Sequence, residues 1–199
     1  MKILLNLIAY PIVALTSAIP RAAQADLSGP FIAGAWSSDP ETPFHGTPIN
    51  ASGGKFYINR DASTYCPNIS GLDCSLYSGK ETTFAIDDGS TTMSLQVSVP
   101  GGQRVYLAPD GALSYTQAHS AYIPPNSIVT GFSREQGPET DAPIYLYSEV
   151  PNWYLCPVTE GEPSERTYQI FALSEDTEGC IYTEIQTYTP NEGHVWQYA

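Results

Sequence analysis

Residues 99–124, VPGGQRVYLAPDGALSYTQAHSAYIP, place Asp110, His119 and Ser120 close together in the sequence. A serine hydrolase uses these residue types as orienting acid, base and nucleophile. Ser120, however, lacks the flanking glycines of a nucleophile elbow, and Asp110 lies in a Pro-Asp-Gly turn, where an aspartate normally caps its own backbone. If residues 116–122 are extended, His119 and Ser120 also point to opposite faces of a sheet. We therefore expect no catalytic residues in this segment.

Histidines and carboxylates elsewhere offer two further chemistries. His45, His119 and His194 could bind a metal only if folding brought them together, because they lack the close spacing of a metal motif. A glycosidase needs two acids on opposite sides of the scissile bond. Most acids cluster in predicted loops, and Glu184 is the exception that lies in a predicted strand. We expect no metal and no cofactor, and a secreted glycoside hydrolase remains an alternative.

The elements that must position these residues are predicted to be strands. Met93, Leu95, Val97 and Val99 alternate with polar residues, the period of a half-buried strand, and no amphipathic helical pattern occurs. Turn sequences rich in Gly, Pro and Asp separate the runs. The pattern predicts an all-β fold, a single antiparallel β-sandwich or barrel-like domain. The other predicted strands are 31–36, 55–59, 82–86, 104–107, 112–116, 144–148, 167–173 and 180–189; the predicted long loops are 136–143 and 161–165.

The N-terminus indicates export. Residues 1–25 combine an early lysine, an apolar run near 3–15 and a small-residue end, which is typical of a secretory signal peptide. The remaining residues, 26–199, form the predicted single secreted domain. Asn50 and Asn68 each begin an Asn-x-Ser sequon and are the predicted N-glycosylation sites. No later segment is long and apolar enough for a membrane span.

The charge balance narrows the class of partner. The chain has 8 basic and 21 acidic residues, a formal net charge of −13. Such a surface repels phosphate backbones and anionic lipid head groups. We therefore expect neither a nucleic acid nor a membrane as partner.

Four cysteines, Cys66, Cys74, Cys156 and Cys180, follow the predicted signal peptide. An even number in an exported chain favours two disulfides over metal ligation. Three pairings are possible. We expect Cys66–Cys74 and Cys156–Cys180, because sequential pairing closes short loops.

Aromatic residues are the most abundant candidates for binding. The chain has 14 tyrosines, and many aromatic residues stand one or two positions apart; Tyr182 and Tyr188 form a wider pair within one predicted strand. Rings on a sheet surface stack on sugar faces, but rings also build the core and cross-strand pairs of a β-protein. Because alternation places about half of them inward, both roles stay open. The candidate ligand-binding residues are Trp36, Tyr145, Tyr147, Trp153 and Tyr154, and Trp196 is a further tryptophan to test.

Several motifs in a fixed order resemble a known family. FIAGAW, PFHGTPINASGGKFYI, TYCP and TTFAI are followed by the segment 99–124, then by WYLCPV and TYQIFAL. Together they resemble small secreted fungal proteins described as PhiA-related cell-wall proteins or as IgE-binding, allergen-like proteins. The resemblance implies a secreted or wall-associated glycoprotein with a β-rich domain and no established catalytic residues. The chain departs from shorter members in its acidic loops and in the tail after Thr189.

The sequence thus predicts a non-enzymatic, secreted or cell-wall-associated fungal glycoprotein with a structural or interaction role at the cell surface. Its expected partner is a cell-wall polysaccharide or a cell-surface or host protein. The first alternative is a carbohydrate-binding protein that uses exposed tyrosines and tryptophans. The second is the secreted glycoside hydrolase.

Overall fold

The structure is a computed structural model that describes residues 27, 29–39, 42–87, 89–139, 141–191 and 193–199. The predicted signal peptide, residues 1–25, lies outside the described residues. Within them, the only helix is the short 3-10 helix η1, Cys74–Leu76, and no helix could span a membrane.

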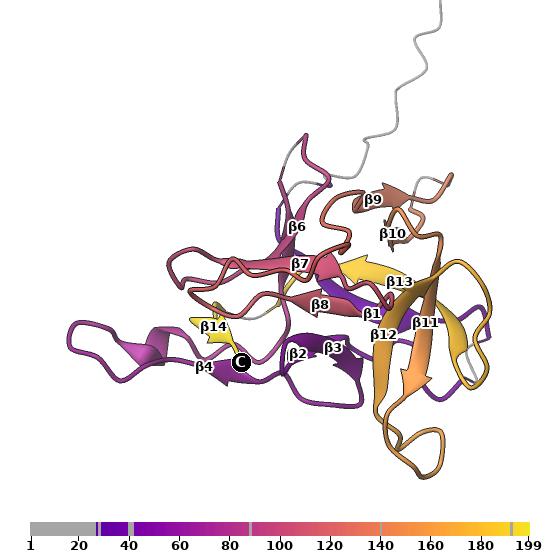
Figure 1. The fold of residues 1–199 in the computed structure, drawn as a ribbon, viewed down its shortest axis with the longest axis horizontal. Helices are drawn as coiled ribbons and strands as arrows, with labels where there is room; N and C mark the ends of the chain where they lie inside the picture. Colours follow the sequence, from indigo (N-terminus) through magenta and orange to yellow (C-terminus); the bar gives the residue numbers. More distant parts are fainter. Residues whose placement is uncertain (1–26, 28, 40–41, 88, 140, 192) are drawn as a thin grey trace, which may run out of the picture.

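Short strands make up the rest of the regular structure (Figure 1). In chain order they are β1 Ile32–Trp36, β2 Asn50–Ser52, β3 Lys55–Ile58, β4 Thr64–Tyr65, β5 Phe84–Ile86, β6 Met93–Leu95, β7 Gln103–Leu107, β8 Leu113–Tyr115, β9 Ser133–Gln136, β10 Ile144–Tyr147, β11 Asn152–Pro157, β12 Tyr168–Leu173, β13 Ile181–Tyr188 and β14 Gln197–Tyr198.

One antiparallel sheet curls until its ends meet. The hydrogen-bonded order is β5-β6-β7-β8-β3-β12-β11-β13, and β1 pairs with the other edge of β13. Phe31, which precedes β1, closes the ring: its N–H donates to the Phe84 carbonyl at 2.9 Å and its carbonyl accepts from the Phe84 N–H at 2.7 Å. The predicted all-β, antiparallel, barrel-like fold is therefore confirmed, and closure leaves few exposed strand edges for aggregation.

Aromatic side chains fill the space inside this ring. The Phe56 ring lies 5.2 Å from both the Phe84 and the Tyr115 rings, and the Phe31 ring stacks on Phe84 at 5.5 Å. All four side chains are buried. Burial of each phenylalanine contributes about 1.5–3 kcal/mol, so this cluster is a main source of stability.

The C-terminal strand is held by two side chains. Gln103 is buried, and its amide accepts from the Tyr198 N–H at 2.8 Å and donates to the Tyr198 carbonyl at 2.9 Å. The Tyr198 hydroxyl donates to the Glu81 carbonyl at 2.8 Å and accepts from the Thr83 N–H at 2.9 Å. These four bonds fix β14, which pairs with β4 outside the main sheet.

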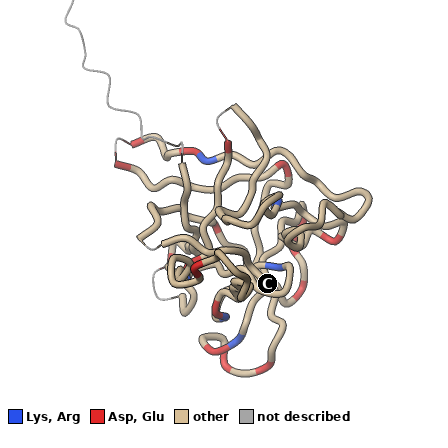
Figure 2. Tube along the Cα trace, turned by 90° about the vertical axis from the view of Figure 1, so that its left-hand side faces the viewer, with Lys and Arg blue, Asp and Glu red and all other residues tan. Residues whose placement is uncertain are grey.

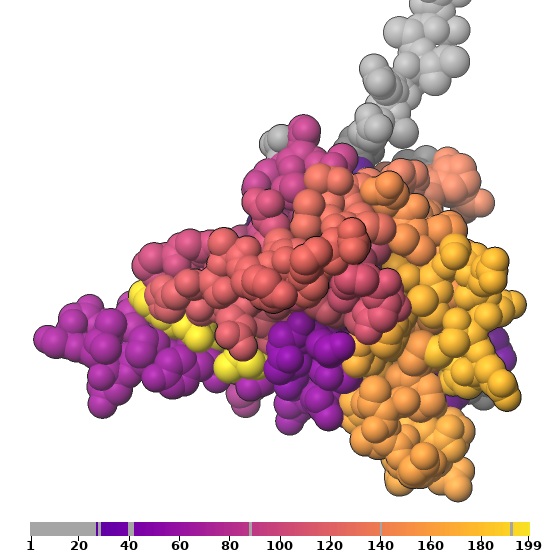
Figure 3. Space-filling view, in the orientation of Figure 1, coloured from indigo at the N-terminus to yellow at the C-terminus, as the bar shows by residue number. Residues whose placement is uncertain are grey.

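The predicted disulfides are confirmed, and each one staples a loop. Cys66–Cys74 closes the loop after β4, which projects from the body of the molecule (Figures 1 and 3). Cys156–Cys180 ties β11 to the chain just before β13. The first disulfide therefore holds a projecting loop, and the second fixes the end of the loop between β12 and β13 to the core strand β11.

Every predicted strand run contains an observed strand, but one run pairs over only part of its length, and β2, β4, β9, β11 and β14 lie outside the predicted runs. The run 93–99 pairs as β6 only over Met93–Leu95, and beyond it Val97 forms an isolated parallel bridge with Val195. β9, Ser133–Gln136, was missed because its polar sequence SREQ has no apolar alternation. Acidic positions are spread around the chain trace, and basic positions are few (Figure 2).

Candidate functional site

The segment with Asp110, His119 and Ser120 does not assemble a catalytic triad. The Asp110 carboxylate accepts from the Ala112 N–H at 3.1 Å, so it caps its own turn as predicted. The Ser120 hydroxyl accepts from the Tyr122 N–H at 3.2 Å. Neither interaction connects these groups to an imidazole.

The premise that residues 116–122 are extended is wrong. β8 ends at Tyr115, and a turn follows in which the Ser120 N–H donates to the Gln117 carbonyl at 3.1 Å. His119 has a φ of 61°, in the left-handed region. His119 and Ser120 therefore line the same groove, together with Arg104 and Thr116, rather than opposite faces of a sheet.

The three histidines lie in different surroundings. The His45 ring packs against Trp36 with centroids 5.7 Å apart, and the His194 carbonyl accepts from the Gly79 N–H at 3.2 Å. His119 lies in the groove beside Ser120. Within the described part of the chain, no group of three or more His, Cys, Asp or Glu side chains could hold a metal ion.

The more promising site is built on the outer side of β13. Burial alternates along this strand: Thr183, Ile185 and Thr187 are buried. The intervening residues Tyr182, Glu184, Gln186 and Tyr188 therefore point to the outer side.

Neighbouring strands bring more rings to this side. Trp36 of β1 lies opposite Glu184, and Tyr145 of β10 lies opposite Gln186. Two residues further along β10, Tyr147 points the same way, because side chains alternate. We refer to these rings as the aromatic face, which consists of Trp36, Tyr145, Tyr147, Tyr182 and Tyr188.

The rings of the aromatic face are partly open to solvent. Tyr182 is 55 % exposed, Tyr147 43 % and Tyr188 39 %. Trp36 is half-buried and contacts Tyr145 edge to face, with centroids 5.8 Å apart. Stacked and edge-to-face contacts fix ring orientation, so the face presents ordered aromatic surface.

A small pocket opens where the sheet forks. β13 pairs with β10 at Gln186 and Thr187, and on the same edge with β11 from Ile181 to Thr183. Glu184 and Ile185, between these two pairings, have no registered partner in β10 or β11. A cavity of about 40 Å³ occupies the fork and is lined by Tyr145, Leu146, Tyr147, Pro151, Trp153, Tyr182, Thr183, Glu184 and Ile185.

The charge of Glu184 acts on three phenols around this pocket. Burial raises the pKa of the Tyr145 and Tyr182 hydroxyls above the ordinary value, and the negative charge of Glu184 raises both further. Burial also raises the pKa of Tyr147, followed by the charges of Glu135 and Glu184. The phenols therefore stay neutral and able to donate hydrogen bonds well into alkaline solution.

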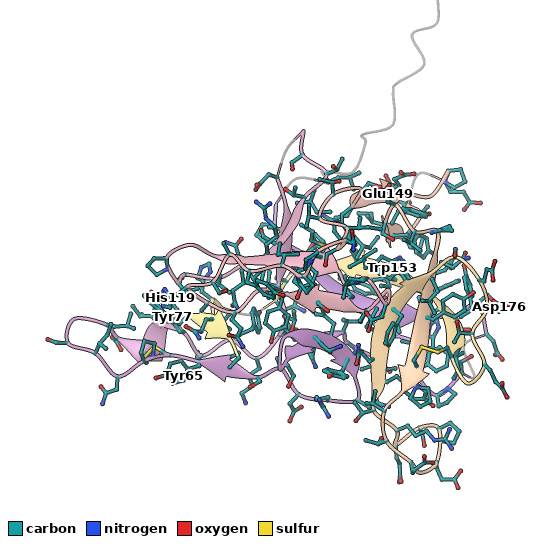
Figure 4. The ribbon with its side chains drawn as sticks, in the orientation of Figure 1. Tyr65, Tyr77, His119, Glu149, Trp153 and Asp176 are labelled. Atoms are coloured by element: carbon teal, nitrogen blue, oxygen red, sulfur yellow. A yellow bond between two sulfur atoms is a disulfide. The ribbon has the colours of Figure 1, made fainter. Side chains whose placement is uncertain are left out.

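Two of the five predicted ligand-binding residues are not accessible, which corrects that prediction. Trp153 points inward because it lies opposite buried Thr183; it is 4 % exposed, and its indole N–H donates to the Leu146 carbonyl at 2.9 Å (Figure 4). Tyr154 points outward but is 3 % exposed, because it packs edge to face on Tyr182 at 6.0 Å. Its hydroxyl donates to the Asp176 carboxylate at 2.6 Å, in the loop before β13.

The other three predicted ligand-binding residues lie together on the aromatic face: Trp36, Tyr145 and Tyr147. Tyr182 and Tyr188 belong to the same face but were not predicted from the sequence. The signal for both was the alternation in CIYTEIQTYT, which places Tyr182, Glu184 and Tyr188 on one side. Which side faces solvent could not be read from the strand alone.

The remaining predicted positions lie elsewhere. Asn68 is exposed in the loop closed by Cys66–Cys74, whereas Asn50 is half-buried in β2 and its amide donates to the Arg60 carbonyl at 2.9 Å. Trp196 is half-buried, with its ring edge to face on Tyr77 at 5.3 Å. Glycosylation of either asparagine stays a prediction.

Comparison with known proteins agrees with the resemblance seen in the sequence. A family model described as PhiA-like secreted protein matches residues 33–199. An uncharacterized secreted protein of Arthroderma benhamiae is 38 % identical over 126 residues, which are 63 % of this chain and 59 % of the relative. The match thus spans about three fifths of that relative's length. No solved structure matches. The chain belongs to the PhiA-like secreted protein family, and it is a secreted protein.

Proposed function

We propose that this PhiA-like secreted protein is a non-enzymatic protein of the cell surface that binds a wall polysaccharide through its aromatic face. The observation that carries the proposal is the group of partly exposed rings on the outer side of β1, β13 and β10. Sugar rings present apolar C–H faces, and aromatic rings on a rigid sheet stack on them with little loss of entropy.

The surroundings of the rings suit a sugar as well. The phenols of Tyr145, Tyr147 and Tyr182 can donate hydrogen bonds to sugar hydroxyls. The Tyr188 hydroxyl already donates to the Gln186 amide oxygen at 2.8 Å, which leaves the Gln186 NH2 group free to donate. Secretion, which the family description gives, supports the proposal because wall polymers lie outside the cell.

A hydrolase fits the site less well. Hydrolysis of a glycosidic bond requires two carboxyl groups that flank the bond. Glu184 is the single acid among the residues that line the pocket in the fork. The groove beside His119 contains no acid among its lining residues either. We therefore propose binding without turnover.

The direct test is a pull-down of the purified protein on insoluble β-glucan and chitin. Tyr182→Ala should weaken retention about fivefold, since loss of one ring contact costs about 1 kcal/mol. Tyr65→Ala is the matched control, because Tyr65 on β4 is 53 % exposed but lies outside the aromatic face. Trp153→Ala is unsuitable, because truncation of a buried tryptophan costs about 3–5 kcal/mol of stability.

Two results would contradict the proposal. The first is no retention on either polymer, or equal weakening by Tyr182→Ala and Tyr65→Ala. The second is turnover of a glycan, ester or peptide that disappears in Glu184→Gln or His119→Ala, which would assign a hydrolase instead.

A further inference from the structure

We propose that the pocket in the fork of β13 receives a protonated primary amine, so that the preferred polysaccharide is an amino-sugar polymer with free amino groups, such as deacetylated chitin. This inference rests on the proposed polysaccharide binding and names the ligand class of the same site. Four features of the pocket support it.

The first feature is the isolation of the Glu184 carboxylate. Among the described residues, no basic side chain pairs with it and no donor makes a hydrogen bond to it. No lysine or arginine lines the pocket. Nearby Arg134 is engaged elsewhere, with the Leu27 carbonyl at 3.1 Å, the Thr187 hydroxyl at 3.2 Å and the Phe31 ring. Glu184 is half-buried, so a cation bound in the pocket would form a close ion pair that is less screened by water than a pair on the open surface.

The second feature is the set of rings around that carboxylate. Tyr145, Tyr147 and Tyr182 line the pocket together with Glu184. Aromatic faces attract ammonium groups, and the attraction grows when the cation is desolvated. A neutral hydroxyl or an acetamide would gain neither this attraction nor the ion pair with Glu184.

The third feature is size. A volume of about 40 Å³ is too small for a sugar ring but sufficient for a head group that replaces one or a few waters. An amine that projects from a sugar stacked on the aromatic face would enter the fork, whose deep wall is formed by Trp153 and Leu146.

The fourth feature is the negative electrostatic potential of the whole protein, which surrounds the pocket. A formal net charge of −13 attracts cationic polymers at long range and repels acidic ones. This long-range effect acts on any cation, however, so the test must separate it from the local effect of Glu184.

The test measures binding of chito-oligosaccharides of equal length, fully acetylated or fully deacetylated, by calorimetry with the complete secreted protein. The wild type should bind the deacetylated form about tenfold more tightly, the gain expected of one charge-assisted hydrogen bond. Glu184→Gln should remove this preference by weakening the binding of the deacetylated form more than that of the acetylated form. Asp61→Asn removes the same charge from an exposed position outside the pocket and should keep the preference.

Each outcome decides between the two proposals. Equal affinity of the wild type for both oligosaccharides would overturn the amine site and leave polysaccharide binding standing. Equal effects of Glu184→Gln and Asp61→Asn would show that net charge alone gives the preference, which also overturns the amine site. Failure of both oligosaccharides to bind, combined with no retention on β-glucan, would remove the proposed function itself. Equal urea midpoints for both variants exclude a folding defect.

Discussion

Two glycines in the segment 99–124 have nearly the same backbone but very different surroundings. Gly101 has a φ of +90° and Gly111 a φ of +84°. A Cβ at Gly101 would have no atom within 4 Å, whereas a Cβ at Gly111 would meet the Ala172 carbonyl oxygen at 2.5 Å and a Leu173 methyl at 2.8 Å. The turn at Gly111 is also bound to β12, because the Ala172 N–H donates to the Gly111 carbonyl at 2.9 Å.

We predict that Gly111→Ala destabilises the protein far more than Gly101→Ala. Left-handed strain costs about 1–2 kcal/mol for alanine, and the reduced entropy of the unfolded chain returns about 0.4–1 kcal/mol; both effects are common to the two variants. The difference is therefore the steric cost of separating the turn from β12, about 1–3 kcal/mol for an overpacked contact with backbone. Gly101→Ala should lose about 1 kcal/mol or less, and Gly111→Ala about 2–4 kcal/mol.

The measurement is urea unfolding with the disulfides intact, followed by the fluorescence of buried Trp153. A difference of 2 kcal/mol corresponds to about 4–8 °C in melting temperature for a domain of this size. If the two variants fall within about 0.5 kcal/mol of each other, the close approach of the turn to β12 is not present in solution.

Three further predictions concern stability and modification. Burial raises the pKa of Tyr198 from 10.0 to about 12. The neutral phenol therefore contributes about 2–3 kcal/mol to the free energy of unfolding below pH 10, and this contribution is lost as the pH rises toward 12. Tyr198→Phe should make the fall in unfolding free energy at alkaline pH less steep, and an unchanged fall would contradict this. A disulfide that closes a longer loop restricts the unfolded chain more. Removal of Cys156–Cys180, with a separation of 24 residues, should therefore lower the unfolding free energy by about 3.5 kcal/mol, and removal of Cys66–Cys74, with a separation of 8, by about 2.5 kcal/mol. Denaturant unfolding measures both, and the reverse order would refute the loop-length argument. Asn68→Gln should remove the N-glycan, whereas Asn50→Gln should leave the mass of the glycan unchanged. Asn50 is half-buried and its amide already donates to the Arg60 carbonyl, whereas Asn68 is exposed; mass spectrometry before and after glycan release decides this.

The turns show what local sequence can predict and what it cannot. Pro-Gly-Gly and Pro-Asp-Gly predict reversals at both glycines, and both reversals are present. The sequence cannot show that only the second turn packs against β12, because residues 108–112 and residues 171–173 are far apart in the chain. Many strand positions could be predicted from local sequence, but β2, β4, β9, β11 and β14 could not. Closure of the ring depends on the pairing of Phe31 with Phe84, which no local pattern specifies.

The same limit applied to the candidate site. Alternation correctly implies that Trp153 and Tyr154 cannot both face outward. It cannot show that Trp153 is the inward one, nor that Tyr182 and the loop of Asp176 cover Tyr154. The fork of β13 is also invisible in the sequence, because it arises where two strands, β10 and β11, share one edge of a third.

Packing explains the outer side of β13 only in part. Its inner residues are buried and contribute to the core, whereas Tyr182 and Tyr188 remain 55 % and 39 % exposed. Exposed outer positions of a sheet accept threonine or valine at least as well as tyrosine, so stability alone does not require rings there. Tyr182 also covers Tyr154 and so has a structural role. The proposed sugar ligand would account for the area of Tyr182 and Tyr188 that remains exposed.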